Sequence, residues 1–278
     1  MIRLLPVLLC FITFAAQAEM QGVCSSNYPS VMKLDLTAGD TPLSEHLESQ
    51  NVVLRKRGLQ NMSVSAETTF GEPTIKIIFP LGSINPGNGS TPSGGDEFFW
   101  PAFGAAGVDA ACLSYRVRFE EGFQFNKGGK LPGLYGTLDG AVKTKASGCR
   151  RASDGRDFST RLMWRRGGAG EVYAYAANRP GTCGLSLGRG NWWFHPGRWA
   201  QISQEVILNT PGKADGSVRL WIDGQLVLEQ SGLHYRDTAQ TTIRGMFFST
   251  FFGGNDQSWA SPRTQSAQFS DFRLFAPR

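Results

Sequence analysis

Five polar residues in the middle of the chain have types and spacing that suit proton transfer beside an anion. Lys130 lies in a glycine-rich segment, and the pairs Ser159/Arg161 and Tyr173/Tyr175 follow it. A lysine or a tyrosine can transfer a proton, and an arginine can hold a carboxylate in two hydrogen bonds while it stays charged. Ser159 suits a hydrogen-bonding, positioning role better than a nucleophilic one. Together these groups could remove a proton from a carbon beside a carboxylate and stabilise the developing charge.

The two residue pairs are predicted to lie on neighbouring strands of one hairpin. Side chains on a strand alternate between two faces, so Ser159 and Arg161 share a face, and so do Tyr173 and Tyr175. The glycine-rich segment 165–170 is typical of a turn that closes a hairpin, which makes the two strands antiparallel neighbours. We expect the opposite face to pack on the core. Its residues are Phe158, Leu162, Trp164, Val172, Ala174 and Ala176.

Alternating and β-branched segments elsewhere predict an all-β protein. The expected strands span residues 74–79, 112–119, 201–208, 217–222, 225–229, 243–252 and 267–275. Asp223-Gly224, between two of them, is a strong signal for a two-residue hairpin turn. This many antiparallel strands fit a jelly-roll β-sandwich. A glycine- and proline-rich segment at 82–96 is either a lid over a cleft or a surface loop.

The motifs resemble polysaccharide lyase family 14, whose members cleave alginate and related polyuronates by β-elimination. The resemblance rests on Gly-Gly-Lys-Leu-Pro-Gly-Leu at 128–134, Ser-x-Arg at 159–161 and Tyr-x-Tyr at 173–175, in that order. It extends from about Tyr115 to the end of the chain, and it implies an all-β jelly-roll β-sandwich with a concave polysaccharide-binding face. The family's functional positions carry over to Lys130, Ser159, Arg161, Tyr173 and Tyr175.

The resemblance implies an enzyme that cleaves 4-linked polyuronates, either alginate (polymannuronate) or glucuronan, and leaves 4,5-unsaturated uronate ends. Elimination requires removal of the C5 proton, stabilisation of charge on the adjacent carboxylate, and a proton for the departing O4. Arg161 suits the carboxylate. Tyr173 or Tyr175 could transfer a proton if neighbouring cations lowered the phenol pKa. Lys130 could be such a cation, the base itself or a second carboxylate clamp, and the sequence leaves these roles open.

Basic residues gather around the motifs and predict an acidic polysaccharide as the partner, because a cleft lined by one sign of charge concentrates a polyanion. They are Lys127, Lys130, Lys143, Lys145, Arg150, Arg151, Arg156, Arg161, Arg165 and Arg166. A solvated basic loop is the plainer alternative. The candidate substrate-binding residues, which include those near Phe251-Phe252-Gly253-Gly254, are Lys127, Arg165, Arg244, Asn255 and Trp259. The basic insert 138–157 is the visible departure from the family pattern.

Residues 1–18 have the features of a secretory signal peptide. Arg3 precedes an apolar run, and Ala16-Gln17-Ala18 resembles a cleavage site. The run is too short to span a membrane, so we expect a secreted or periplasmic protein without membrane insertion. Removing the leader takes away Arg3, and the formal net charge falls from +5 to +4. Since no linker divides the remainder, residues 19–278 are predicted to form a single polysaccharide lyase domain, which we expect to be a monomer.

Four cysteines remain once Cys10 leaves with the leader, and an even number suits two disulfides in an oxidising compartment. Three pairings are possible. We favour Cys149 with Cys183, because both lie in loops that flank the 158–176 hairpin, and this leaves Cys24 with Cys112. The sequence does not fix the connectivity.

Other chemistries fit the sequence less well. His46, His195 and His234 are scattered without metal-ligand spacing, so we expect no metal and no cofactor. No paired carboxylates suit a glycosidase, no Gly-x-Ser-x-Gly elbow suits a serine hydrolase, and no phosphate-binding or nucleic-acid-binding motif is present. Two alternatives from other classes stay open. One is a non-catalytic carbohydrate-binding jelly-roll protein for acidic polysaccharide, and the other is an envelope protein whose basic face binds anionic lipid or lipopolysaccharide.

Overall fold

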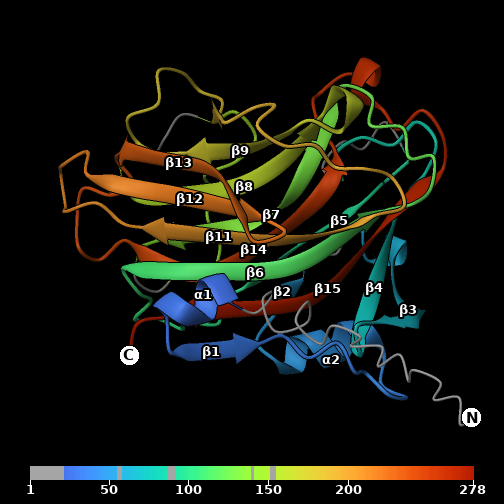
Figure 1. The fold of residues 1–278 in the computed structure, drawn as a ribbon, viewed down its shortest axis with the longest axis horizontal. Helices are drawn as coiled ribbons and strands as arrows, with labels where there is room; N and C mark the ends of the chain where they lie inside the picture. The colour runs from blue at the N-terminus through green and yellow to red at the C-terminus, as the bar shows by residue number, and fades with distance from the viewer. Residues whose placement is uncertain (1–21, 55–57, 87–91, 139–140, 151–154) are drawn as a thin grey trace, which may run out of the picture.

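The alternating hydrophobic pattern of the chain produces two antiparallel sheets that pack face to face (Figure 1). The computed structural model describes residues 22–54, 58–86, 92–138, 141–150 and 155–278. The predicted signal peptide at 1–18 lies outside the described residues, and the segments 82–96 and 138–157 are described only in part. No helix in the described ranges is long and apolar enough to cross a membrane.

In the part of the chain that the structure describes, one sheet has eight strands and the other has seven. The eight-stranded sheet runs, in spatial order, β13 (Gln225–Leu233), β12 (Gly216–Ile222), β11 (Trp199–Ile207), β6 (Ala110–Phe119), β15 (Gln265–Ala276), β4 (Glu72–Phe79) and β3 (Met62–Thr69), and β1 (Ser30–Lys33) also pairs with β15. The seven-stranded sheet runs β10 (Leu185–Leu187), β9 (Gly170–Tyr175), β8 (Asp157–Arg165), β7 (Gly128–Thr137), β14 (Thr242–Phe252), β5 (Asp96–Trp100) and β2 (Val53–Leu54).

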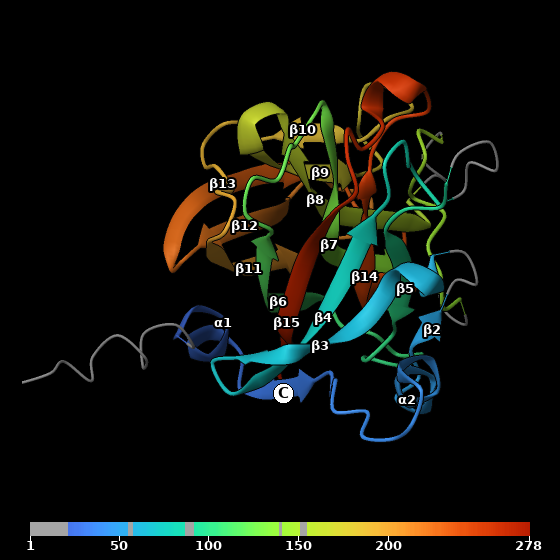
Figure 2. The same cartoon turned by 90° about the vertical axis from the view of Figure 1, so that its right-hand side faces the viewer.

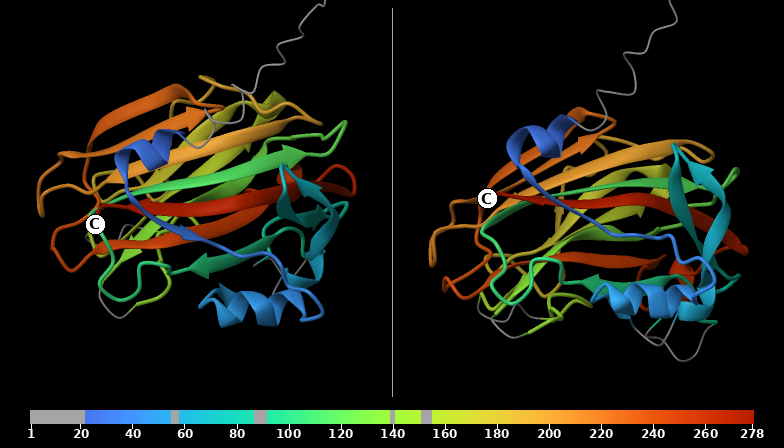
Figure 3. Two further views of the ribbon diagram at one scale, coloured as in Figure 1. Left: turned by 60° about the horizontal axis from the view of Figure 1, so that its bottom comes forward. Right: turned by 90° about the horizontal axis from the view of Figure 1, so that it is seen from below.

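Short helices lie around the two sheets. The α-helices are α1 (Gly22–Asn27) and α2 (Leu43–Ser49), and the 3-10 turns are η3 (Leu59–Asn61), η4 (Arg166–Gly168) and η5 (Gln257–Trp259). Figure 3 shows α1 on the outside of the eight-stranded sheet, where Cys24 and Tyr28 pack against Cys112 and Phe275. Figure 2 shows α2 beside β2, at the edge of the seven-stranded sheet.

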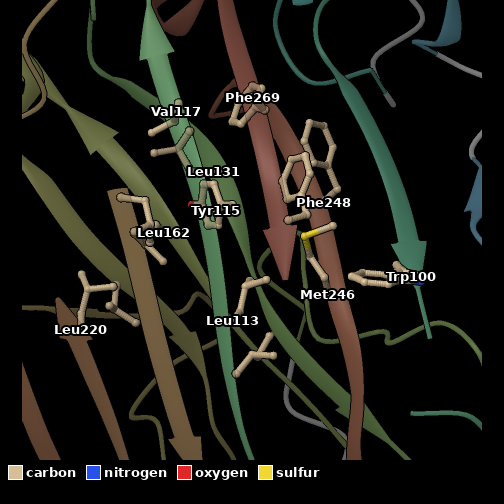
Figure 4. Packing of buried hydrophobic residues seen from close by; sticks show 14 of the residues in the cluster. Trp100, Leu113, Tyr115, Val117, Leu131, Leu162, Leu220, Met246, Phe248 and Phe269 are labelled. Atoms are coloured by element: carbon tan, nitrogen blue, oxygen red, sulfur yellow. The ribbon is translucent and has the colours of Figure 1, made fainter. Parts of the chain in front are cut away.

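The predicted β-sandwich is confirmed, and the two sheets enclose one hydrophobic core. Figure 4 shows Leu113 and Tyr115 of β6 together with Leu131 of β7 and Leu162 of β8. The indole of Trp164 packs edge-on against aromatic rings from both sheets. The predicted core face of the hairpin is therefore correct: Phe158, Leu162, Trp164, Val172, Ala174 and Ala176 are all buried in this core.

The predicted strands are present, with bounds that differ by a few residues. Asp223 and Gly224 both have positive φ (51° and 80°), as a two-residue hairpin turn requires. Six strands were not predicted from the sequence: β1, β2, β3, β5, β7 and β10. The strand β5 begins with Asp96 and Glu97, two residue types that are rare in buried strands, yet all of its residues are buried.

Glycines place Lys130 in β7. The β-carbon of any other residue at position 129 would lie 2.0 Å from Cζ2 of Trp164, so only glycine lets that indole reach the core behind Lys130. A bulge between Leu131 and Gly133 shifts the strand register at Pro132, where β7 has no backbone N–H to donate. Leu131 faces the core, so Lys130 faces the other way.

Candidate active site

The strand register brings the five predicted catalytic residues together on the face of the seven-stranded sheet that points away from the core. We call this face the outer face of the sheet. Ser159 lies opposite Tyr175, and Arg161 lies opposite Tyr173. The Lys130 Nζ atom is 4.3 Å from the centre of the Tyr173 ring, and the two tyrosine rings are 5.5 Å apart, edge to face. Alternation predicted the grouping of Ser159, Arg161, Tyr173 and Tyr175, and the family resemblance added Lys130.

Lys130 lies in an environment that disfavours its charged form. The side chain is partly buried, and its Nζ atom is 2.8 Å from the Met163 Sδ atom, which is a weak acceptor. Burial lowers the pKa of Lys130 well below its usual value, and repulsion from Arg161 and Arg165 lowers it further. A neutral amine is therefore accessible nearer neutral pH, and a neutral amine can accept a proton.

Arg161 is fully buried and held from the neighbouring strands. Its Nη1 atom donates to Ser249 Oγ at 3.0 Å, and that hydroxyl donates to Glu97 Oε1 at 3.0 Å. Its guanidinium carbon lies 4.6 Å from the centre of the Phe247 ring. The guanidinium is thus fixed in place before any substrate arrives. Sequence reasoning missed Ser249 and Glu97, because their contact with Arg161 depends on strand neighbours that no local pattern reveals.

The condition that nearby cations lower a phenol pKa is not met at Tyr173. Burial raises the pKa of Tyr173 to about 12, and the hydrogen bond with Tyr175 also raises it, which outweighs the positive charge of Arg165. Tyr175 is fully buried, and its hydroxyl oxygen accepts a hydrogen bond from the Cys149 N–H at 2.9 Å. The phenol of Tyr173 therefore keeps its proton and suits the role of an acid.

Ser159 points into a loop that covers part of the outer face. It is fully buried, and its hydroxyl donates to the carbonyl oxygen of Ala146 at 2.7 Å. Ala146 packs with Met163 and both tyrosines in one small cluster. Ser159 therefore fastens this loop to β8.

A buried carboxylate orders two arginines beside this group. Glu171 accepts a hydrogen bond from Arg165 Nε at 2.8 Å and another from Arg189 Nε at 2.6 Å. Burial alone would raise the pKa of Glu171, but the hydrogen bonds from Arg165, Ser186 and Arg189 and the charge of Arg165 bring it below its usual value. Glu171 therefore stays ionised and fixes both guanidinium groups.

Three of the predicted substrate-binding residues line one pocket of about 370 Å³. Its lining residues are Lys127, Arg165, Arg166, Ala169, Arg189 and Trp259. We call it the cationic pocket. It adjoins the five predicted catalytic residues, which we call the catalytic group. The guanidinium of Arg165 lies 5.9 Å from the Tyr173 ring and 5.9 Å from the Trp259 ring. Arg189 also lines this pocket, although it was not among the predicted binding residues.

The other two predicted binding residues lie elsewhere. Arg244 is fully buried and donates to the carbonyl oxygens of Gly104, at 2.9 Å, and Thr137, at 3.4 Å. Thr137 is at the opposite end of β7 from Lys130. Asn255 is exposed in the segment between β14 and η5. The five predicted catalytic residues and the cationic pocket therefore lie together, and Arg244 lies away from them.

The alternation of side chains along β8 and β9 could have predicted two more residues on the outer face of the sheet. Met163 follows Arg161 by two positions on β8, and Glu171 precedes Tyr173 by two positions on β9, so each shares the outer face with its neighbour. Within the described ranges, no group of three or more histidine, cysteine, aspartate or glutamate side chains could hold a metal ion.

Comparison with known proteins agrees with this geometry. The model of the family polysaccharide lyase 14 matches residues 67–272. The crystal structure of a marine alginate lyase of that family from Aplysia kurodai is 32% identical, with a TM-score of 0.75, and the match covers 90% of this chain and 100% of that one. No curated protein sequence matches the chain.

Two more distant structures share the fold. An alginate lyase from Chlorella virus is 22% identical with a TM-score of 0.70, and the match covers 90% of this chain and 99% of that one. An endo-β-1,4-glucuronan lyase from the fungus Trichoderma reesei is 11% identical with a TM-score of 0.52, over 90% of this chain and 96% of that one.

Proposed function

The chain belongs to polysaccharide lyase family 14, and we propose that it cleaves 4-linked polyuronates of the alginate or glucuronan type by β-elimination. The observation that supports this proposal most directly is the position of the Lys130 amine. Its pKa is lowered, and its Nζ atom lies 4.3 Å from the centre of the Tyr173 ring. The alginate lyase that is 32% identical supports alginate as the first substrate to test.

In this proposal, Lys130 is the base and the tyrosine pair supplies the acid. The neutral amine takes the C5 proton, and the electron pair of the broken C–H bond forms the C4=C5 double bond. The bond between C4 and O4 breaks, and O4 takes a proton from Tyr173 or Tyr175. The fixed charge of Arg161 stabilises the anion that develops on the substrate carboxylate, since a preorganised cation needs no rearrangement during the reaction.

We propose that the cationic pocket binds a uronate next to the one that reacts. The cations of the pocket, Lys127, Arg165, Arg166 and Arg189, supply positive charge and hydrogen bonds for its carboxylate. The indole of Trp259 offers a flat apolar surface for the sugar ring. Asn255, exposed between β14 and η5, remains a candidate binding residue outside the pocket lining. Arg244, with its hydrogen bonds to backbone carbonyls, is better suited to holding β14 against the segment around Gly104.

We also propose that the protein is secreted or periplasmic, with residues 1–18 removed and 19–278 acting as a single domain. The two disulfides, Cys24–Cys112 and Cys149–Cys183, support an oxidising compartment, and they match the favoured pairing. The single core shared by both sheets supports one domain.

The test is to incubate the purified protein with polymannuronate, polyguluronate and glucuronan separately, across acid to alkaline pH. We expect ultraviolet absorbance to rise with at least one of them, because the new C4=C5 double bond is conjugated with the carboxylate. No rise with any of the three would contradict the lyase proposal and would favour a carbohydrate-binding protein.

Arg166 gives a separate test of the cationic pocket. It is exposed, lines the pocket and is outside the proposed catalytic group. We expect Arg166→Ala to raise KM by about tenfold and to leave kcat within about twofold, because a lost charge-assisted hydrogen bond costs about 1.5 kcal/mol or more. Steady-state kinetics at low and high salt would check this, since added salt should shrink the difference.

The matched control for Arg166→Ala is Lys213→Ala. Lys213 is exposed in the turn between β11 and β12 of the other sheet, so this substitution makes the same change in net charge away from the pocket. Equal KM values for the two variants would argue against a binding role for the pocket.

A further inference from the structure

Two loops meet over the catalytic tyrosines, and a disulfide joins them. One loop is residues 141–150 and the other is residues 177–184, which leads from β9 to β10. Cys149 of the first is bonded to Cys183 of the second. The Cys149 N–H donates to the Tyr175 hydroxyl at 2.9 Å, and the Gly184 N–H donates to the Tyr173 hydroxyl. Cys149 thus binds the Tyr175 phenol through its own backbone, and Cys183 directly precedes Gly184, whose backbone binds the Tyr173 phenol.

The loops leave the tyrosine rings little room to move. A β-carbon at Gly184 would lie 3.0 Å from Cε1 of Tyr173 and 3.0 Å from Cε2 of Tyr175. The Arg179 guanidinium carbon lies 4.7 Å from the Tyr175 ring centre. Its Nη2 atom donates to the carbonyl oxygens of Thr182 and Arg150, one in each loop. The rings, the arginine and the disulfide therefore form one packed unit, which we call the tyrosine clasp.

The two disulfides differ in their exposure to solvent. Cys149 and Cys183 are exposed, whereas Cys24 and Cys112 are 2% and 1% exposed. Thiol–disulfide exchange needs access to a sulfur atom. A mild reductant should therefore open the disulfide of the clasp and leave Cys24–Cys112 intact.

We propose that the Cys149–Cys183 disulfide is a positioning element of the active site, which holds both tyrosine hydroxyls for proton transfer, and that its reduction lowers activity. This rests on the proposed lyase function. In the reduction, a dithiol gives two electrons and two protons to the disulfide, two cysteine thiols form, and the dithiol becomes a cyclic disulfide. The freed loops then no longer fix the Cys149 and Gly184 N–H groups beside the phenols.

Gly184→Ala tests the packing without breaking any bond, and Gly181→Ala is its matched control. A β-carbon at Gly181, in the same loop, meets no described atom within 4 Å. We expect Gly184→Ala to lower kcat by about tenfold or more with KM within about twofold, because small misplacements of catalytic groups are costly. Gly181→Ala should match the wild type. Equal kcat values for the two variants would overturn the proposal.

Reduction tests the disulfide itself. Treatment of the native enzyme with dithiothreitol should free two thiols, lower kcat by about tenfold and leave KM nearly unchanged, and reoxidation should restore kcat. The double variant Cys149→Ser/Cys183→Ser should have the low kcat from the start and should not respond to dithiothreitol. If the reduced enzyme has gained two thiols and keeps the kcat of the untreated enzyme, the proposal is contradicted.

A substrate-free readout separates this proposal from the lyase assignment. Tyr173 faces Lys130 of β7, Arg165 of β8 and Tyr175 of its own strand, and burial is the largest cause of its raised pKa. Opening the loops should let water reach the phenol, and its titration, followed by tyrosinate absorbance, should move from about 12 towards the ordinary value of 10.0. An unchanged titration in the double cysteine variant would contradict the clasp even if no polyuronate were cleaved.

Discussion

Replacing Lys130 by alanine should lower kcat on a cleaved polyuronate by about a thousandfold, because removal of a general base costs 10²–10⁴ in rate. KM should change much less, since the cationic pocket is untouched. The measurement is the steady-state rate of ultraviolet absorbance increase, together with a melting curve to show that the fold is kept. A loss of less than about tenfold would argue against Lys130 as the base.

Two controls separate the base from a carboxylate clamp. Lys130→Arg keeps a positive charge but cannot lose its proton in the working pH range, so it should be as inactive as Lys130→Ala. A small primary amine added to Lys130→Ala should restore part of the rate, and more at higher pH, where the amine is neutral. Activity in Lys130→Arg would instead favour the clamp.

The wild-type pH profile follows from the lowered pKa of Lys130. Protonation of the amine at low pH removes the base, so the rate should rise as pH passes through the pKa of this group. Because that pKa lies well below 10.5, the rise should come well before the range in which an exposed lysine titrates.

Replacing Tyr175 by phenylalanine should lower kcat by about a hundredfold, because the leaving O4 loses its proton donor or the hydroxyl that orients it. Tyr173→Phe should have a comparable effect, since the two hydroxyls are hydrogen bonded to each other. The wild-type rate should persist through pH 10.0, the ordinary phenol pKa, because the pKa of Tyr173 is about 12.

Tyr28→Phe is the control for the tyrosine variants. Tyr28 donates to Glu205 Oε1 at 2.8 Å on the eight-stranded sheet, far from the catalytic group. It should cost stability but not kcat. If Tyr175→Phe has the same kcat as Tyr28→Phe, Tyr175 takes no part in the proposed mechanism.

The sequence predicted the parts of the site that depend on local periodicity. Alternation alone placed Arg161 and Tyr173 on one face, and Trp164 on the other. It could not predict the environment of Lys130, because the pKa of that amine depends on burial and on charges from a neighbouring strand. The raised pKa of Tyr173 could not be predicted for the same reason, since its largest cause is burial, which depends on how loops fold over the strand.

The missed strands also have a physical explanation. The strand β5 starts with two acidic residues, which a local pattern assigns to a loop. Glu97 is buried there because it accepts a hydrogen bond from Ser249 on the neighbouring strand β14. Tertiary contacts thus outweigh local preference at the positions that support Arg161.

The last two strands of the chain occupy interior places in both sheets. The strand β14 lies between β7 and β5, and β15 lies between β6 and β4. These two strands are made after every other described strand, so neither sheet can close until residues 242–276 have been made. Non-local pairings of this kind form slowly. Before that point the nascent chain should therefore lack both closed sheets and their shared core, which suits passage through a translocation channel on the proposed secretory route.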